Sequence, residues 1–167
     1  MLDRLHAALR QLPALLDDRG GWQSLDIDYH PPRVERLFRP FADGRLYLHR
    51  ISPCEPEQAL FHPHPWPCAI RVLEGRYEMG FGAGPGLEAP AIAGRLVAAG
   101  PLDYEMTDPD AWHYVRPLDG PALTIMVAGA PWDRAAPRAD RPLRPLTDDR
   151  VDALLDAVGA VVRGESA

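Results

Sequence analysis

Cysteine is scarce in this chain, and long apolar runs are absent. Only Cys54 and Cys68 occur among the 167 residues, too few for a disulfide framework and without zinc-ribbon spacing. No stretch approaches the ~18 consecutive apolar residues that a transmembrane helix needs. Residues 1–6 also lack the cationic stretch and apolar run of a signal peptide. These absences predict a cytoplasmic protein with no membrane partner.

An excess of basic residues is lacking as well. The 24 acidic residues outnumber the 18 basic ones, which gives a formal net charge of −6 and a pI near 5.4. Proteins that bind nucleic acid present basic patches, whereas the arginines here are interspersed with acids. We therefore expect no nucleic-acid partner.

Proline, by contrast, is abundant. The chain has 19 prolines, about twice the average share. Proline breaks helix interiors and is excluded from central strand ladders, so short elements and many turns are expected. The length suits one domain, and we expect a single domain over residues 1–167.

Helices are predicted only at the two ends of the chain. Leucines at three- to four-residue spacing predict an amphipathic helix over residues 1–20, interrupted near Pro13. A proline-rich linker over residues 131–147 leads into a second helix over 148–163, for which Thr147 is the expected cap.

The region between the helices, residues 25–130, has a different pattern. Short segments rich in Val, Ile, Leu, Tyr and Trp are punctuated by Gly, Pro and Asp about every ten residues, which is typical of an all-β sandwich or barrel. Turns are expected at Gly75 and at Asp119-Gly120.

Histidines in this region form the most informative pattern. His62 and His64 are separated by one residue, so on a strand their side chains point the same way. Neutral imidazoles favour zinc, iron, copper or nickel. His113 lies on a second strand-like segment about fifty residues later. The alternative for the first pair is two histidines on the surface or in a loop.

The frame around these histidines resembles the cupin superfamily. Its first motif is met from His64 through Cys68, in the position of the usual glutamate, to Gly75; Gly100, Pro109 and His113 follow the order of the second. The resemblance covers about residues 40–130. It implies a mainly all-β cupin double-stranded β-helix, or jelly roll, and cupin sheets often pair into a homodimer.

The cysteine at position 68 makes the chain look like a subset of cupins, the thiol dioxygenases of the cysteine dioxygenase type. That resemblance implies iron bound by His62, His64 and His113, and an arginine that holds the substrate carboxylate, here Arg39 or Arg36. The late tyrosine of that subset would fall near residues 125–127, where none stands.

Four further residues are catalytic candidates. Tyr77 and Tyr104 can place a hydroxyl near the metal, although buried tyrosines more often bond to the backbone. Glu78 is the best carboxylate for a fourth ligand or a base, with a solvent-facing glutamate as the alternative. Cys68 can line the metal pocket or can act as a small buried apolar side chain.

Four residues are candidates for substrate binding. Arg39 or Arg50 can anchor a carboxylate, and His49 can contact either the substrate or a metal ligand. Trp66, between two prolines, can stack on a substrate or form a rigid wall of the barrel. An ordinary core or edge histidine is the alternative for His49.

Three functions remain open on this pattern. The first is an iron-dependent dioxygenase or related oxidoreductase that acts on a small polar organic molecule. The second is an isomerase, lyase or hydrolase that uses the metal as a Lewis acid. The third is a cupin that binds a small molecule without catalysis. One divalent metal ion is expected, with Fe(II) favoured and zinc, nickel or manganese as alternatives.

Overall fold

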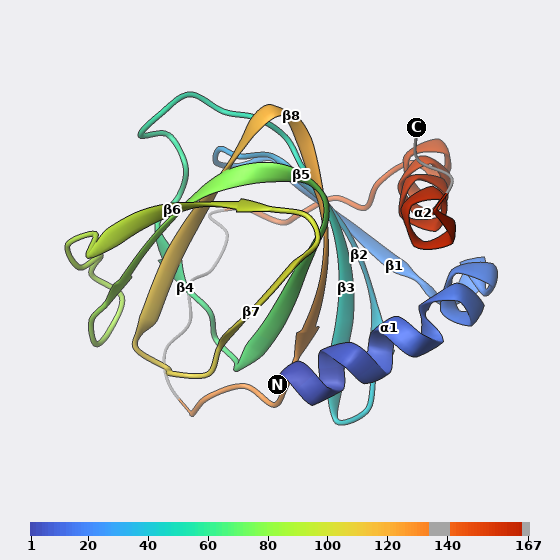
Figure 1. Cartoon of the computed structure of the whole chain (residues 1–167), viewed down its shortest axis with the longest axis horizontal. Helices are drawn as coiled ribbons and strands as arrows, with labels where there is room; N and C mark the ends of the chain where they lie inside the picture. The colour runs from blue at the N-terminus through green and yellow to red at the C-terminus, as the bar shows by residue number, and fades with distance from the viewer. Residues whose placement is uncertain (134–140, 165–167) are drawn as a thin grey trace.

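The computed structural model describes residues 1–133 and 141–164. Its helical elements are α1 (Leu2–Asp17), the 3-10 turn η1 (Arg19–Gly21) and α2 (Asp148–Arg163). Its strands are β1 (Gln23–Ile27), β2 (Val34–Phe41), β3 (Gly44–Ile51), β4 (His62–Pro63), β5 (Cys68–Ala83), β6 (Gly94–Ala99), β7 (Leu102–Met106) and β8 (Ala111–Ala128). Figure 1 shows the strands wrapped into a barrel with the two helices on one side. Residues 134–140, in the predicted linker, lie outside the described residues.

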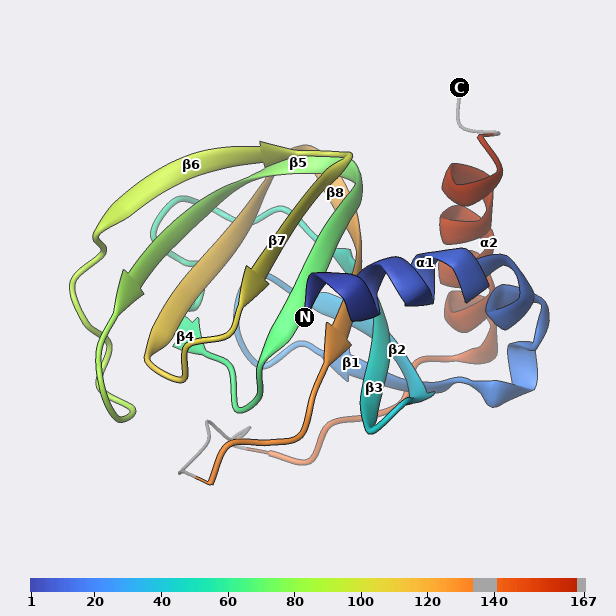
Figure 2. The same cartoon turned by 60° about the horizontal axis from the view of Figure 1, so that its bottom comes forward.

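Two long strands, β5 and β8, each take part in both halves of the barrel. The first half of β5 pairs with β7 and with the second half of β8. The second half of β5 pairs with β6 and with the first half of β8. The strands therefore form two facing layers, β1-β2-β3-β8-β5-β7 and β4-β8-β5-β6, in which every pairing is antiparallel. Figure 2 shows β6 and β7 leaving β5 in different directions.

The turns predicted at Gly75 and at Asp119-Gly120 are wrong, because the chain stays within a strand at both places. β5 passes Gly75 (φ +80°) through two register shifts. β8 passes Asp119 (φ 61°) and Gly120 (φ 144°) at the matching point. An extra residue in one strand bends it without ending it, and this bend carries each strand from one layer to the other.

The two helices cover the outer face of the larger layer. Leu12 of α1 and Leu154 of α2 belong to one buried cluster with Leu37, Leu46 and Ile125 of the sheet. Both faces of this layer are therefore covered, one by the helices and the other by the barrel interior. Neither described helix is long and apolar enough to cross a membrane.

The helix ends follow the predicted signals only in part. Gly164 ends α2 with left-handed backbone (φ 72°), and its amide donates to carbonyl groups of the last turn. Thr147 stands at the N-cap, but its side chain makes no capping hydrogen bond. The predicted interruption at Pro13 is wrong, since α1 continues to Asp17. The mainly all-β architecture with a helix near each terminus is confirmed.

Candidate metal centre

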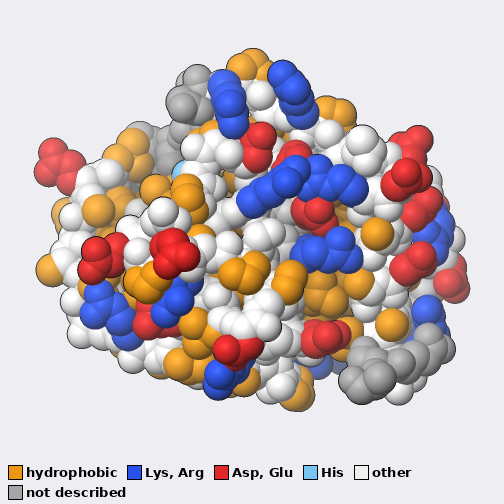
Figure 3. Space-filling model, turned by 90° about the horizontal axis from the view of Figure 1, so that it is seen from above, with side chains coloured by type: hydrophobic (Ala, Val, Ile, Leu, Met, Phe, Trp, Pro, Cys, Tyr) orange, Lys and Arg blue, Asp and Glu red, His pale blue; other side chains and the backbone are white. Residues whose placement is uncertain are grey.

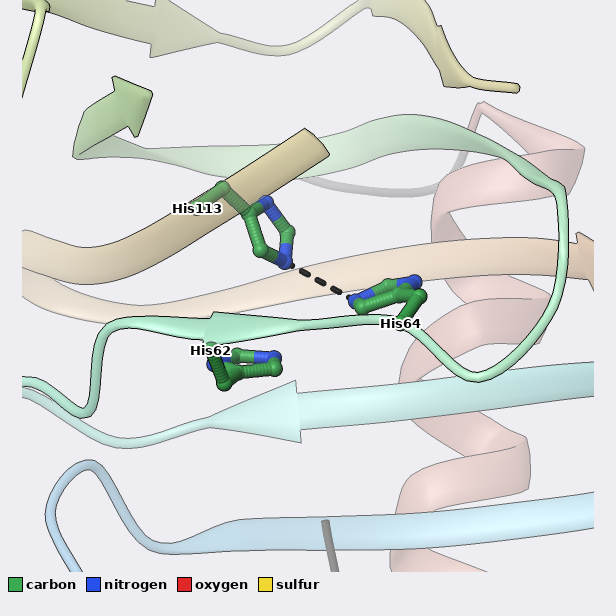
Figure 4. A group of neighbouring side chains, drawn as sticks. All are labelled: His62, His64 and His113. Carbon is green, nitrogen blue, oxygen red and sulfur yellow. Dashed lines mark hydrogen bonds between the residues drawn. The ribbon is translucent and has the colours of Figure 1, made fainter. Parts of the chain in front are cut away.

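The strands place the three histidines on one inward face. β4 pairs with the first half of β8 so that His62 lies directly opposite His113. Each of His62, His64 and Trp66 is followed by a proline, which favours extended backbone. The extended backbone keeps His62 and His64 on the same side, and β4 is an edge strand that tolerates Pro63. Figure 4 shows the three rings turned toward one another.

The donor atoms of these histidines converge. One ring nitrogen from each lies within 4.8 Å of the other two. Nε2 of His64 lies 3.0 Å from Nε2 of His113, as the dashed line in Figure 4 marks. Two histidine nitrogens bound at about 2.1 Å to one ion, at an angle near 90°, are about 3.0 Å apart. The donor set therefore fits a single divalent metal ion.

Hydrogen bonds to the other ring nitrogens hold two of the rings in this orientation. Nδ1 of His62 lies 2.9 Å from the carbonyl oxygen of Leu60 and donates to it, which leaves Nε2 as a free lone-pair donor. Nδ1 of His64 lies 2.9 Å from the sulfur of Cys68. Cys68 therefore contacts a candidate ligand from behind, and it is not part of the group of converging donors.

Burial sets the protonation of these groups. Desolvation lowers the pKa of His62 to about 4, and it holds the pKa values of His64 and His113 well below 6.5. All three imidazoles are neutral near pH 7, the form that binds metals. Burial also raises the pKa of the Cys68 thiol to about 12, so the sulfur is not a thiolate.

A pocket opens beside the three histidines. Its walls combine polar and apolar side chains from both layers. They are Val34, Arg36, His49, Ile51, His62, His64, Ile70, Tyr77, Tyr104, His113, Val115, Thr124 and Met126. Arg36 is the only ionised side chain among them near pH 7.

A pair of tyrosines joins the two layers at this pocket. The hydroxyl of Tyr77 donates to the hydroxyl of Tyr104 at 2.9 Å, and the ring centroid of Tyr104 lies 6.4 Å from that of His113. Burial raises the pKa of both hydroxyls. Tyr104 therefore keeps its proton near pH 7 and lines the pocket close to a candidate metal ligand.

Arg39, Arg50 and Glu78, which the sequence predicted in the site, lie away from the histidine pocket. Side chains alternate along a strand, and these three point out of the barrel. Arg39 donates to Asp18 at 2.8 Å. Arg50 donates to Glu35 at 2.9 Å and to a carbonyl oxygen of α2. Glu78 accepts from Tyr114 at 2.8 Å on the outer face of the smaller layer. None of them lines the histidine pocket.

Trp66 also lies away from the histidine pocket. It stacks on Tyr47 with a centroid distance of 6.0 Å and borders a different hollow beside Gly44, at the tip of the β2–β3 hairpin. The histidine pocket contains Val34 and Ile51, at the opposite end of that hairpin. Trp66 is therefore placed as a wall of the barrel.

The sequence interpretation missed Thr124 and named Arg36 only as an alternative to Arg39. Both side chains line the pocket, with His49 between them. The signal that separates Arg36 from Arg39 is strand alternation, because Leu37 and Arg39 share the face that the helices cover. That signal requires knowing which face of β2 the helices cover.

Two facing antiparallel layers, strands shared between them, and histidines converging in the interior define a protein of cupin fold with a candidate metal centre. The chain matches no protein-family model and no curated protein sequence. Among solved structures it is similar to hydroxypropylphosphonic acid epoxidase from S. wedmorenis, at 15% identity and a TM-score of 0.51. That match covers 66% of this chain and 56% of the epoxidase chain, so this chain spans about half the length of the epoxidase.

A second similar structure is that of CapF with the inhibitor 3-isopropenyl-tropolone. Its identity is 14%, its TM-score is 0.46, and the match covers 66% of this chain and 31% of that one. At 15% identity the similarity to the epoxidase concerns the fold alone, and it gives no support for the thiol dioxygenase subset in particular.

Proposed function

We propose that this protein is a mononuclear metal-dependent cupin enzyme, a non-haem iron dioxygenase or related oxidoreductase that acts on a small polar organic substrate. The observation that carries the proposal is the convergence of three neutral imidazoles, two half-buried and one buried, at one pocket. No carboxylate from the described residues lines that pocket. Three neutral ligands leave a divalent ion with its full charge and with open coordination positions.

A ferrous ion held by His62, His64 and His113 would supply the capacity to bring oxygen and substrate together at one centre. The surrounding residues have separate tasks. Apolar side chains such as Val34, Ile51 and Val115 exclude water from the pocket.

Arg36 takes the role of the carboxylate anchor that the resemblance implied. Its side chain is half-buried at the pocket wall, and its charge lowers the pKa of His62 and of His64, after the larger effect of burial. The epoxidase named above has a small phosphonic acid in its name, and the proposal extends that size and polarity to the substrate of this chain.

Tyr104 is the proposed proton carrier. Its hydroxyl accepts from Tyr77 and would donate its own proton to a group in the pocket. The alternative function, a Lewis-acid isomerase, lyase or hydrolase with zinc, nickel or manganese, draws support from this same proton, because such chemistry needs an acid beside the metal. A cytoplasmic location and a homodimer stay predictions.

Anaerobic reconstitution with Fe(II), followed by oxygen-uptake assays with a panel of small organic acids, tests the proposal. Elemental analysis should find about one metal ion per chain in the wild type and in His6→Ala, whose histidine lies on the surface of α1. His64→Ala should lose the ion. Strong preference for zinc without oxygen uptake would favour the Lewis-acid function. Equal metal content in the wild type, His6→Ala and His64→Ala would rule out both the oxidoreductase and the Lewis-acid function at this site.

A further inference from the structure

A row of hydrogen-bonded side chains crosses three neighbouring strands at the pocket wall. Arg36 on β2 lies opposite His49 on β3, which lies opposite Thr124 on β8. Nε of Arg36 lies 3.1 Å from Nε2 of His49. Nδ1 of His49 lies 3.1 Å from Oγ1 of Thr124. His49 and Thr124 are almost fully buried, at 6% and 2% exposure.

The chemistry of arginine fixes the direction of these bonds. A guanidinium can only donate, so Nε2 of His49 must be the acceptor. The single proton of the neutral imidazole then resides on Nδ1, which donates to the Thr124 hydroxyl. Thr124 thereby holds the histidine ring in the tautomer that Arg36 requires.

These bonds also orient the guanidinium. Nε is engaged by His49, and the guanidinium carbon lies 5.3 Å from the ring centroid of Tyr47. Tyr47 in turn stacks on His49 at 5.9 Å with an interplanar angle of 16°. No acidic side chain of the described residues contributes to the environment of the Arg36 guanidinium. A partly desolvated cation with no acid beside it gains stability when an anion joins it.

The geometry points to His49, held by Thr124, as the positioning residue that aims the Nη1–Nη2 edge of Arg36 at a substrate carboxylate. This inference rests on the proposed function, in which Arg36 anchors the substrate. An arginine edge matches the planar, bidentate geometry of a carboxylate. A single positive charge matches one negative charge. His49 therefore controls how strongly the pocket prefers a carboxylate to its neutral amide.

The test is a titration of the cobalt-loaded protein with L-lactate and with lactamide, followed through the cobalt absorption spectrum. The two probes share one carbon skeleton and hydroxyl group, but lactate carries a charged carboxylate where lactamide has a neutral amide. His49→Leu should weaken lactate binding about 10- to 100-fold, since hydrogen bonds to charged groups are the strong ones. Lactamide affinity and cobalt content should stay unchanged. General damage to the fold would lower both, so this control separates it from the loss of the His49 contact.

His49→Gln is the rescue variant, because its amide oxygen can accept from Arg36 and its amide nitrogen can donate to Thr124. It should restore the lactate preference to within about threefold of the wild type. Thr124→Val removes only the outer hydroxyl and should weaken lactate binding about 3- to 10-fold. It keeps the test valid if His49→Leu does not fold.

An unchanged ratio of lactate to lactamide affinity in His49→Leu, or in Thr124→Val if His49→Leu does not fold, would overturn the inference. So would a wild type that binds both probes equally. If cobalt does not bind at all, the proposed function fails. Calorimetry on the metal-free protein then still decides whether Arg36 selects the carboxylate and whether His49 controls that selection.

Discussion

Replacing Arg36 with methionine should make the metal-free, ligand-free protein more stable. Methionine keeps the length and most of the apolar contacts of the arginine stem but removes the buried charge. Burying an ion without a partner costs several kcal/mol. In this structure the bond to His49 offsets about 1.5–3 kcal/mol of that cost. The face of Tyr47 offsets about 1–2 kcal/mol more.

These opposing contributions leave a small net gain on removing the charge. We expect Arg36→Met to raise the free energy of unfolding by about 1 kcal/mol, which corresponds to about 2–4 °C in Tm for a chain of this length. The same variant should lose its preference for lactate over lactamide. A gain in stability together with a loss of lactate preference is expected when a residue contributes to binding but destabilises the fold.

Urea unfolding of the EDTA-treated protein measures the effect, and Arg39→Met is the matched control. Arg39 lies on the opposite face of the same strand, pairs with Asp18 at 2.8 Å and packs over Trp22 at 5.3 Å. Its removal should lower the free energy of unfolding by about 1 kcal/mol. If Arg36→Met destabilises the protein as much as Arg39→Met does, the inference that the Arg36 charge is uncompensated is refuted.

Three further outcomes can be measured by thermal or urea unfolding. The pKa of His62 is about 4 in the folded protein against an ordinary 6.5, so the unfolded chain binds more protons between these values. The metal-free protein should lose about 2 kcal/mol of stability from His62 alone between pH 7 and pH 5, and His62→Gln should reduce that loss. Saturating Fe(II) or Zn(II), at about 100 times Kd, should stabilise the wild type and His6→Ala by about 2.7 kcal/mol and leave His64→Ala unchanged. Gly75→Ala should cost about 1–3 kcal/mol more than Gly86→Ala, because both have φ +80° but only at Gly75 would the new Cβ meet a backbone oxygen, at 2.8 Å.

Local geometry in the sequence was enough to predict two of the three histidines of the candidate metal centre. Two-residue periodicity puts His62 and His64 on one face wherever the strand lies, and prolines hold the segment extended. The third candidate ligand, His113, required the cupin resemblance, since nothing local indicates that β4 pairs with β8. The pairing found in the structure places it opposite His62.

The wrong predictions share two physical causes. Positive φ at Gly75 and Gly120 signals a turn and a bulge equally well, so the sequence alone does not show that the strands continue. Arg39 and Glu78 were placed in the site because the sequence shows alternation without showing which face is the interior. In the larger layer both faces are covered, so hydrophobicity does not separate them.

Charged side chains are distributed over the surface as the sequence predicted. Figure 3 shows acidic and basic side chains interspersed over one face, with only a trace of histidine colour. His49 and His113 are buried, at 6% and 5% exposure.

The bend in β8 has a consequence for substrate length. His113 precedes the bend and Thr124 follows it, so one continuous strand carries both a candidate metal ligand and the end of the hydrogen-bonded row that reaches Arg36. Under the proposed function, the backbone at Asp119 and Gly120 would set the distance between the reacting end of a bound acid and its anionic end. A change in that backbone would then alter the preferred substrate length without replacing any residue that lines the pocket.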